Sequence, residues 1–113
     1  MREPNGRRRP GIQSKIYVAE DMIGPGKVAF LAHLAEAGSM AGAAARMGVD
    51  DARAAFLLET LQACFAAPLI AEEGEQVVLT ALGSELMRRY EEHQAAIEAA
   101  SAEFLDWLAE NQP

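Results

Sequence analysis

Four residues of types that could do catalytic or metal chemistry stand apart from one another in the sequence: His33, Cys64, Ser84 and His93. A zinc site needs several histidine, cysteine or carboxylate ligands at characteristic spacings, and neither histidine has a second histidine or cysteine at such a spacing. A serine nucleophile on a strand-to-helix elbow stands in a G-x-S-x-G pattern, and the stretch LGSEL around Ser84 lacks this pattern and its context. We therefore expect these residues in structural positions, and the sequence predicts no enzyme, no cofactor and no bound metal.

The residues suited to nucleic-acid chemistry are arginines, because a guanidinium group can pair with a phosphate or with the edge of guanine. Arg46 and Arg53 could contact DNA in this way, or they could form surface ion pairs with Asp50 or Glu59, which stabilise little. A run of three more arginines stands near the N-terminus: Arg7, Arg8 and Arg9. This run could be an arm that enters the minor groove of DNA or only a solubilising tail.

The distribution of charge limits the strength of any DNA binding. The net charge of the 113 residues is −7, and residues 1–10 hold four arginines against one glutamate. Residues 11–113 hold six basic and sixteen acidic residues, a balance of −10. Non-specific DNA affinity comes from neutralising phosphates. The acidic body therefore opposes such affinity, and the basic arm is the feature that could offset it.

The length and composition suit one domain built mainly of helices. Half the residues are hydrophobic, aromatic residues are few and alanines are many, which favours closely packed helices. No apolar run approaches the roughly 18 residues that a membrane span needs. The basic N-terminus is not followed by the apolar segment of a secretory signal. We therefore expect a cytoplasmic protein that does not enter a membrane.

The elements that must position these residues can be read along the chain. Residues 1–13 are rich in Arg, Pro and Gly and are predicted to form a flexible basic arm, and residues 14–113 the folded domain. Residues 14–21 form a strand candidate, after which Pro25 suits the first position of a helix. Gly38 is suited to end that helix in a left-handed conformation.

Residues 37–61, AGSMAGAAARMGVDDARAAFLLETL, have the outline of a helix-turn-helix. Ser39 is a natural N-cap for the first of the two helices, Gly48 supplies the turn, and Asp50 is a natural N-cap for the second. That helix is predicted to run from residue 51 to 67 and to stop at Pro68. Asp50 and Asp51 could also accept a hydrogen bond from cytosine, although helix capping and support of the helix dipole explain both.

The remaining residues predict a hairpin and one long helix. Residues 68–80 read as a short acidic hairpin with its turn near Gly74, and Thr80 can cap a helix from about residue 81 to 109. A helix of that length reaches ~43 Å, more than the diameter of such a domain. Its apolar face is expected to pair with a second copy of the chain. The predicted dimer-interface residues are Tyr90, Ile97, Phe104, Trp107 and Leu108.

The combination of motifs resembles a known family. The stretches IGPGKVAFLAHLAEAGSMAGAAARMGV, FAAPLI and LTALGSELMRRYEEH are similar to the N-terminal winged helix-turn-helix domain of molybdate-responsive regulators of the ModE type, and more distantly to LysR-type regulators. The matching positions are residues 24–27, 38–45, 65–70 and 79–83, and the resemblance covers roughly residues 14–100. It implies a dimer built by the last helix, the N-terminal strand and the first helix.

The resemblance also implies DNA binding, with the third helix in the major groove and the wing near a phosphate backbone. The positions that would carry it are Ser39 and Ala41, residues 50–53 and the wing residues 72–76. The sequence departs from the family at these places, because Asp50 and Asp51 begin the third helix and the wing is short and acidic. The molybdate-binding domains of full-length ModE are absent, so no molybdate binding is expected.

The sequence thus predicts a mainly α winged helix-turn-helix with a short N-terminal strand, a β-hairpin wing and a long C-terminal dimerisation helix. The expected function is that of a homodimeric, sequence-specific DNA-binding regulator of transcription. Its predicted DNA contacts are Arg7, Arg8, Arg9, Ser39, Arg46, Asp50 and Arg53. The alternative is a diverged winged-helix module that binds other proteins and no longer binds DNA.

Overall fold

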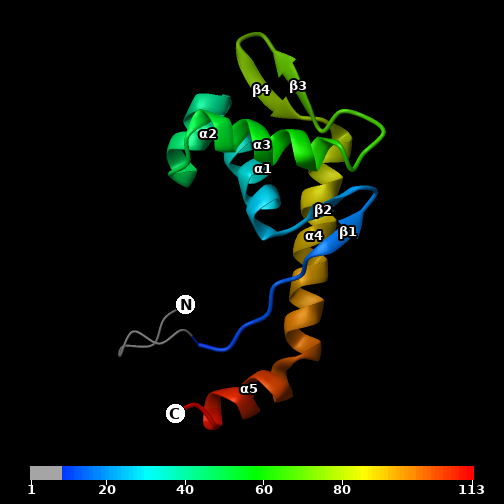
Figure 1. Ribbon diagram of the computed structural model, residues 1–113. Coiled ribbons are helices and arrows are strands. Elements are labelled where there is room, and N and C mark those ends of the chain that lie inside the picture. The colour runs from blue at the N-terminus through cyan, green and yellow to red at the C-terminus, as the bar shows by residue number, and fades with distance from the viewer. Residues whose placement is uncertain (1–8) are drawn as a thin grey trace.

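The computed structural model describes residues 9–113, and this part of the chain folds as a winged helix-turn-helix with two antiparallel hairpins (Figure 1). The elements in chain order are β1 (Ile16–Val18), β2 (Asp21–Ile23), α1 (Pro25–Ala37), α2 (Met40–Met47), α3 (Asp51–Gln62), β3 (Ile70–Glu73), β4 (Gln76–Leu79), α4 (Ala81–Ala100) and α5 (Ala102–Glu110). Helices α1, α2 and α3 and the β3–β4 hairpin form a head, from which α4 leads away to α5. The predicted fold class is confirmed.

Helix α1 lies at the centre of the head, where its apolar side chains are covered by the other elements. Phe30, Leu31 and Leu34 are almost completely buried. Ala43 and Ala44 of α2 are buried against the same core. Because alanine has a small side chain, α2 can approach α1 closely, as the alanine-rich sequence of α2 predicts.

The beginnings of three helices follow the predicted capping pattern. The Ser39 hydroxyl accepts a hydrogen bond from the backbone N–H of Gly42 at 3.0 Å, which begins α2. An oxygen of Asp50 accepts from the N–H of Arg53 at 2.7 Å, which begins α3. Thr80 caps α4 in the same way. These side chains satisfy N–H groups that the first turn of a helix leaves without an internal partner.

The wing is tied to the helix-turn-helix by one backbone hydrogen bond. Gly38 ends α1 with a φ of 73°, a left-handed conformation that glycine adopts readily. Its carbonyl then accepts a hydrogen bond from the N–H of Val77 in β4 at 2.8 Å. The predicted hairpin turn is also confirmed, with Gly74 at a φ of 61° between β3 and β4.

The N-terminal strand is part of a hairpin that the sequence analysis missed. Ile16 pairs with Ile23, and the chain turns at Ala19, which has a φ of 53°. The ammonium group of Lys27, in the first turn of α1, donates to Asp21 at 2.8 Å and to the carbonyl of Met22 at 2.7 Å. These contacts hold β2 against the start of α1. The N-terminal hairpin is therefore stabilised by a side chain that lies outside both of its strands. The β-propensity of the strand residues alone does not indicate this contact.

Helix α3 is shorter than predicted, because it ends at Gln62 and not at residue 67. The Gln62 side chain donates to the carbonyl of Ala67 at 2.8 Å and accepts from the N–H of Leu69 at 2.9 Å. These two bonds hold the chain after Gln62 in a loop that leads to the buried Leu69. The helix therefore ends before it reaches Pro68. Phe65, which lies within the predicted range of this helix, is therefore in the following loop.

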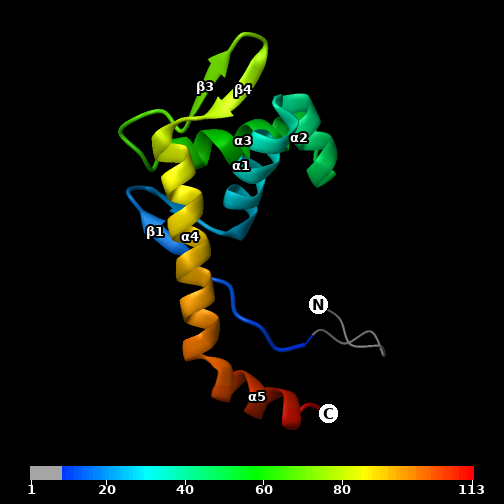
Figure 2. The same cartoon turned by 180° about the vertical axis from the view of Figure 1, so that it is seen from behind.

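The predicted single helix over residues 81–109 is divided into two by Ser101. Ser101 has φ −97° and ψ −1°, and α5 leaves the axis of α4 at this point (Figures 1 and 2). The N–H of Ser101 still bonds to the carbonyl of Ile97, and the N–H of Leu105 bonds to the carbonyl of Ser101. The break is thus a bend with backbone hydrogen bonds on both sides. Serine favours such helix ends over helix interiors.

Candidate nucleic-acid interface

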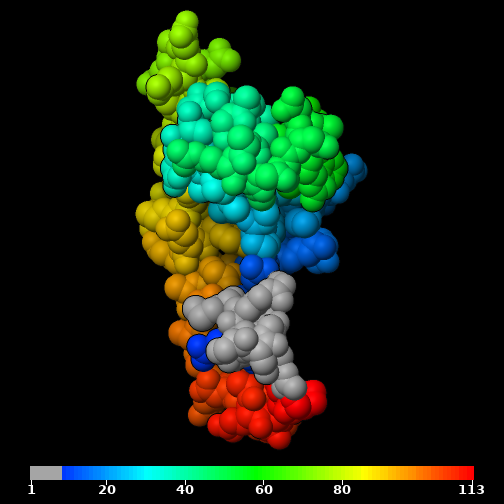
Figure 3. Space-filling view, turned by 90° about the vertical axis from the view of Figure 1, so that its left-hand side faces the viewer, coloured from blue at the N-terminus to red at the C-terminus, as the bar shows by residue number. Residues whose placement is uncertain are grey.

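The two helices of the helix-turn-helix lie side by side on one end of the molecule. The space-filling view shows α2 and α3 side by side in the head, below the wing and well away from α5 (Figure 3). Along α3, Ala54, Leu57 and Leu61 face the core, whereas Arg53 and Phe56 are exposed. The side of α3 that faces solvent is thus the surface that could enter a DNA groove.

Arg53 is the cation on the exposed side of α3. Its guanidinium carbon lies 5.2 Å from the centre of the Phe56 ring, in a cation–π contact, and 49% of Phe56 is exposed. Within residues 9–113, Arg53 forms no ion pair with a carboxylate, and the surface pair with Asp50 or Glu59 that the sequence allowed is not formed. The five N–H donors of Arg53 therefore remain available to a base or a phosphate.

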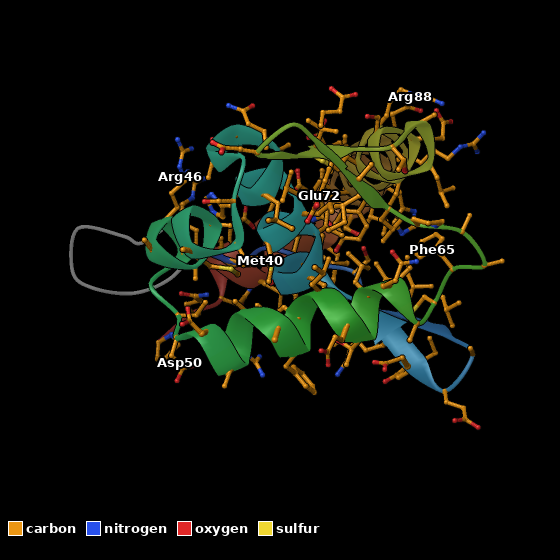
Figure 4. All side chains as sticks on the ribbon, turned by 90° about the horizontal axis from the view of Figure 1, so that it is seen from above. Met40, Arg46, Asp50, Phe65, Glu72 and Arg88 are labelled. Atoms are coloured by element: carbon orange, nitrogen blue, oxygen red, sulfur yellow. The ribbon has the colours of Figure 1, made fainter. Side chains whose placement is uncertain are left out.

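Arg46 has a carboxylate partner, although not one of the two considered from the sequence. Its guanidinium group donates to Glu36 of α1 at 2.6 Å, and both side chains are largely exposed. Figure 4 shows Arg46 at the outer edge of α2, far from the labelled Asp50 at the start of α3. An exposed pair of this kind contributes little free energy. Arg46 could therefore exchange Glu36 for a phosphate at small cost.

The side chains of Ser39 and Asp50 are occupied by their capping hydrogen bonds. One oxygen of Asp50 bonds the first turn of α3, and the residue stands at the outer end of that helix (Figure 4). Asp51 follows in the first turn and is exposed. The capping explanation for Asp50 is thus confirmed, while the negative charge of both residues stays at the end of the helix that would approach DNA.

Two substitutions at Asp50 separate its capping role from its charge. Asp50→Ala is expected to lower the free energy of unfolding by about 1 kcal/mol, because the N–H of Arg53 loses its acceptor. Asp50→Asn should leave it nearly unchanged, since asparagine caps as well as aspartate. Urea denaturation of the two variants beside the parent protein measures the difference. Equal losses for both variants would contradict a capping role.

The wing carries negative charge on its exposed side chains. Glu72, Glu73 and Glu75 are all exposed around the β3–β4 turn. Carboxylates at this place repel a phosphate backbone, as the sequence predicts. The wing therefore offers no cationic contact to DNA among its own residues 70–79.

Residues 12–14, where the N-terminal arm joins the folded domain, are hydrogen-bonded to α4. The side-chain amide of Gln94 donates to the carbonyl of Ile12, and the Tyr90 hydroxyl donates to the carbonyl of Ser14 at 3.0 Å. The chain entering the arm thus runs beside α4, on the side of the head away from the wing (Figure 2). Arg9 is described and exposed, whereas Arg7 and Arg8 lie outside the described residues, so their proposed DNA contacts stay predictions.

The predicted dimer residues fall into three groups by burial. Tyr90 is buried in the core of its own chain, where its ring packs with the other apolar residues. Phe104 and Trp107 of α5 are 61% and 56% exposed, and their rings stack with centroids 6.2 Å apart. Ile97 and Leu108 are half-buried. No residue of α5 is buried, which leaves Phe104 and Trp107 as an apolar surface without cover from the described chain.

The two arginines of α4 belong to a local network of charges. Glu85 bonds both Arg88, one turn ahead, and Arg89. The hydrogen bonds from Arg88 and then Arg89 lower the pKa of Glu85 below its usual value. Arg88 also bonds Glu92. Positive charge on α4 is therefore balanced within the helix and adds no basic patch to the head.

Sequence reasoning missed two features of this region. Phe56 was not singled out, although an aromatic residue three places after Arg53 on a helix is near enough to stack on it. The buried pair of Lys27 with Asp21 joins two elements, and its only signal was the position of Lys27 in the GPGK motif. Among residues 9–113, no group of three or more His, Cys, Asp or Glu could hold a metal ion. No helix in the same range is long and apolar enough to cross a membrane.

The fold is shared with solved structures of transcriptional regulators. No protein-family model matches the sequence, and no curated protein matches it. VV2_1132, a LysR family transcriptional regulator, superimposes with a TM-score of 0.59 and 18% identity over 70% of this chain and 29% of its own. Full-length CbnR, solved in complex with its target DNA, gives a TM-score of 0.56 and 22% identity over 68% of this chain and 27% of its own. The chain thus spans under a third of either regulator, and at these identities the likeness establishes the fold alone.

Proposed function

We propose that the protein regulates transcription by binding DNA sequence-specifically as a homodimer, with α3 in the major groove. The observation that carries the proposal is the exposed Arg53 on the outer side of α3, held over Phe56 and without a carboxylate partner among the described residues. An arginine in this place can bond guanine through two of its nitrogens. Phe56 beside it can contact the methyl group of thymine.

Two likenesses support this proposal. CbnR, which shares the fold, was solved in complex with its target DNA. The motifs around residues 24–27, 38–45, 65–70 and 79–83 resemble those of ModE-type regulators.

The dependence of binding on salt tests the proposal. Fluorescence anisotropy with labelled genomic fragments is measured at about 50 and 200 mM salt, a range over which cationic contacts lose much of their affinity. We expect binding at the lower concentration that weakens as salt rises, and a preference for some fragments over others. The absence of binding at low salt would reject DNA binding by this chain.

The proposed homodimer rests on the exposed rings of α5. Trp107→Ala is expected to weaken self-association by about five-fold or more, because a large aromatic side chain at the centre of an interface commonly contributes over 1 kcal/mol. Sedimentation equilibrium of the parent protein and the variant measures this effect. Phe56→Ala is the matched control, since Phe56 is also an exposed aromatic residue but lies on α3, away from α5. A parent protein that is monomeric at micromolar concentration would refute the dimer.

A second candidate function is that of a winged-helix module that binds another protein. The observation that favours it is the exposed acidic wing, with Glu72, Glu73 and Glu75 together, on a domain that carries more acids than bases. Such a surface suits a basic partner. Failure of DNA binding at low salt, with the dimer intact, would favour this candidate over the first.

A further inference from the structure

A cavity of about 510 Å³ opens between the N-terminal hairpin, the start of α1 and the first half of α3. Its apolar wall is formed by Met22, Pro25, Phe56 and Leu57. Volumes of this size are typical of sites that hold small organic molecules. None of the functions considered above uses this cavity as a binding site.

The charges around the cavity are opposite in sign to those of the rest of the domain. Three cations line it, Lys15, Lys27 and Arg53, against one carboxylate, that of Asp21. Lys27 is 5% exposed and its ammonium group bonds Asp21, which lowers the pKa of that carboxyl. Asp21 thus stays ionised and is neutralised by Lys27, so that Lys15 and Arg53 leave an excess of positive charge. In a chain of net charge −7, this is a local site for an anion.

The shape of the cavity adds a preference for a flat ligand. The exposed part of the Phe56 ring and the planar guanidinium group of Arg53 lie one over the other at its wall. Both groups stack on aromatic rings. Gly26 also lines the cavity, and a Cβ atom built on it would meet no heavy atom within 4 Å, so the space beside the start of α1 is open.

We propose that this cavity binds a small aromatic carboxylate, whose ring packs on Phe56 and the neighbouring apolar residues and whose carboxylate pairs with Arg53 and Lys15. This inference needs only the free protein and does not depend on DNA binding. If DNA binding also holds, the ligand and the DNA compete for Arg53. The ligand would then release the protein from DNA, as an effector does.

The test uses 2-naphthoate as the probe and 2-naphthol as its uncharged counterpart. Backbone amide chemical shifts of the ¹⁵N-labelled protein are followed while each compound is added. We expect saturable shifts at Gly24, Gly26 and Lys27 with naphthoate, and binding of naphthol weaker by about ten-fold or more, because an ion pair with Arg53 is lost. Equal affinity for the two compounds, or shifts at other places only, would overturn the proposal.

Two variants locate the ligand. Gly26→Leu places a side chain in the open space of the cavity without changing a charge, and should abolish the shifts. Gly11→Leu is its matched control, because a Cβ there also meets almost open space, with only the carbonyl of Arg9 at 4.0 Å, and Gly11 does not line the cavity. Lys15→Gln should reduce the preference for naphthoate over naphthol. Binding that survives Gly26→Leu unchanged would place the ligand elsewhere and contradict the proposal.

Competition with DNA is measured separately, once anisotropy has shown DNA binding by the parent protein. We expect naphthoate, but not naphthol, to lower the DNA affinity of the parent protein, and Gly26→Leu to remove this effect. If the amide shifts appear and no DNA binds, the cavity proposal stands and the DNA proposal fails. If DNA binds and no amide shifts appear, the DNA proposal stands and the cavity proposal fails.

Discussion

Replacing Gly83 by alanine is expected to lower the free energy of unfolding by about 3 kcal/mol, at the upper end of what overpacking usually costs. Gly83 is buried in the first turn of α4, and a Cβ atom there would lie 2.2 Å from the carbonyl oxygen of Leu69. That oxygen cannot move freely, because it accepts a hydrogen bond from the N–H of Thr80 at 3.0 Å. The Leu69 side chain is completely buried as well. A domain of this size is stable by roughly 5–15 kcal/mol, so the loss would be a large part of the total.

Urea denaturation followed by circular dichroism measures this loss. Gly26→Ala is the matched control, because Gly26 also lies in the first turn of a helix but has open space where the Cβ atom would be placed. Alanine is the better helix former, so this variant should be as stable as the parent protein or slightly more stable. A Gly83→Ala protein that unfolds at the same urea concentration as Gly26→Ala would show that α4 and Leu69 can separate without cost.

The second large effect is expected at Arg53. If the protein binds DNA through α3, Arg53→Ala should reduce the affinity for its preferred fragment by roughly 1–3 kcal/mol, which is about 5- to 150-fold. The preference among fragments should fall with it if Arg53 bonds a base. If Arg53 bonds only a phosphate, all fragments should lose affinity equally and the salt dependence should become shallower. Anisotropy titrations with several fragments at two salt concentrations separate these results.

Arg46→Ala is the matched control for Arg53→Ala. Both variants remove one positive charge from the helix-turn-helix, but Arg46 already pairs with Glu36 and lies on α2. We expect a smaller loss for Arg46→Ala, with no change in the preference among fragments. Circular dichroism and the urea midpoint must match the parent protein in both cases. A larger loss for Arg46 than for Arg53 would move the DNA surface from α3 to α2.

The parts of the fold that could be predicted from the sequence are those with local causes. Ser39, Asp50 and Thr80 begin helices because a short polar side chain can reach the N–H groups of the next turn. Gly38 and Gly48 end helices because they adopt a left-handed backbone at no steric cost. Each signal needs only the four or five residues around it. The helix-turn-helix and the wing follow from these signals.

The parts that were missed depend on contacts between distant residues. The early end of α3 requires the Gln62 side chain to bond the backbone of the loop that follows. The second N-terminal strand requires Lys27 of α1 to bond Asp21 and Met22. The local sequence favours a helix through residue 67 and a break after residue 23. The structure differs at both places because side chains from outside these segments bond to their backbone.

The candidate site was predicted residue by residue but not as an arrangement. Arg53 and Arg46 were both singled out, yet the sequence could not decide which one has an acidic partner. Glu36, the partner of Arg46, lies ten residues earlier on another helix. The cavity beneath Arg53 depends on four separate segments and has no signal within any one of them. Surface pairs and cavities are therefore properties of the assembled fold.

The hydrogen bond between Val77 and Gly38 has a consequence for how the wing moves. Because it joins β4 to the turn between α1 and α2, a tilt of the hairpin away from that turn would break this bond. The wing and the helix-turn-helix are thus coupled, and this coupling limits how far the wing can move when a partner binds. A stiff surface loses little conformational entropy on binding, and it also has little capacity to adapt to a partner of a different shape. The acidic wing thus stays where the fold holds it, and any DNA that α3 reads must be accommodated around it.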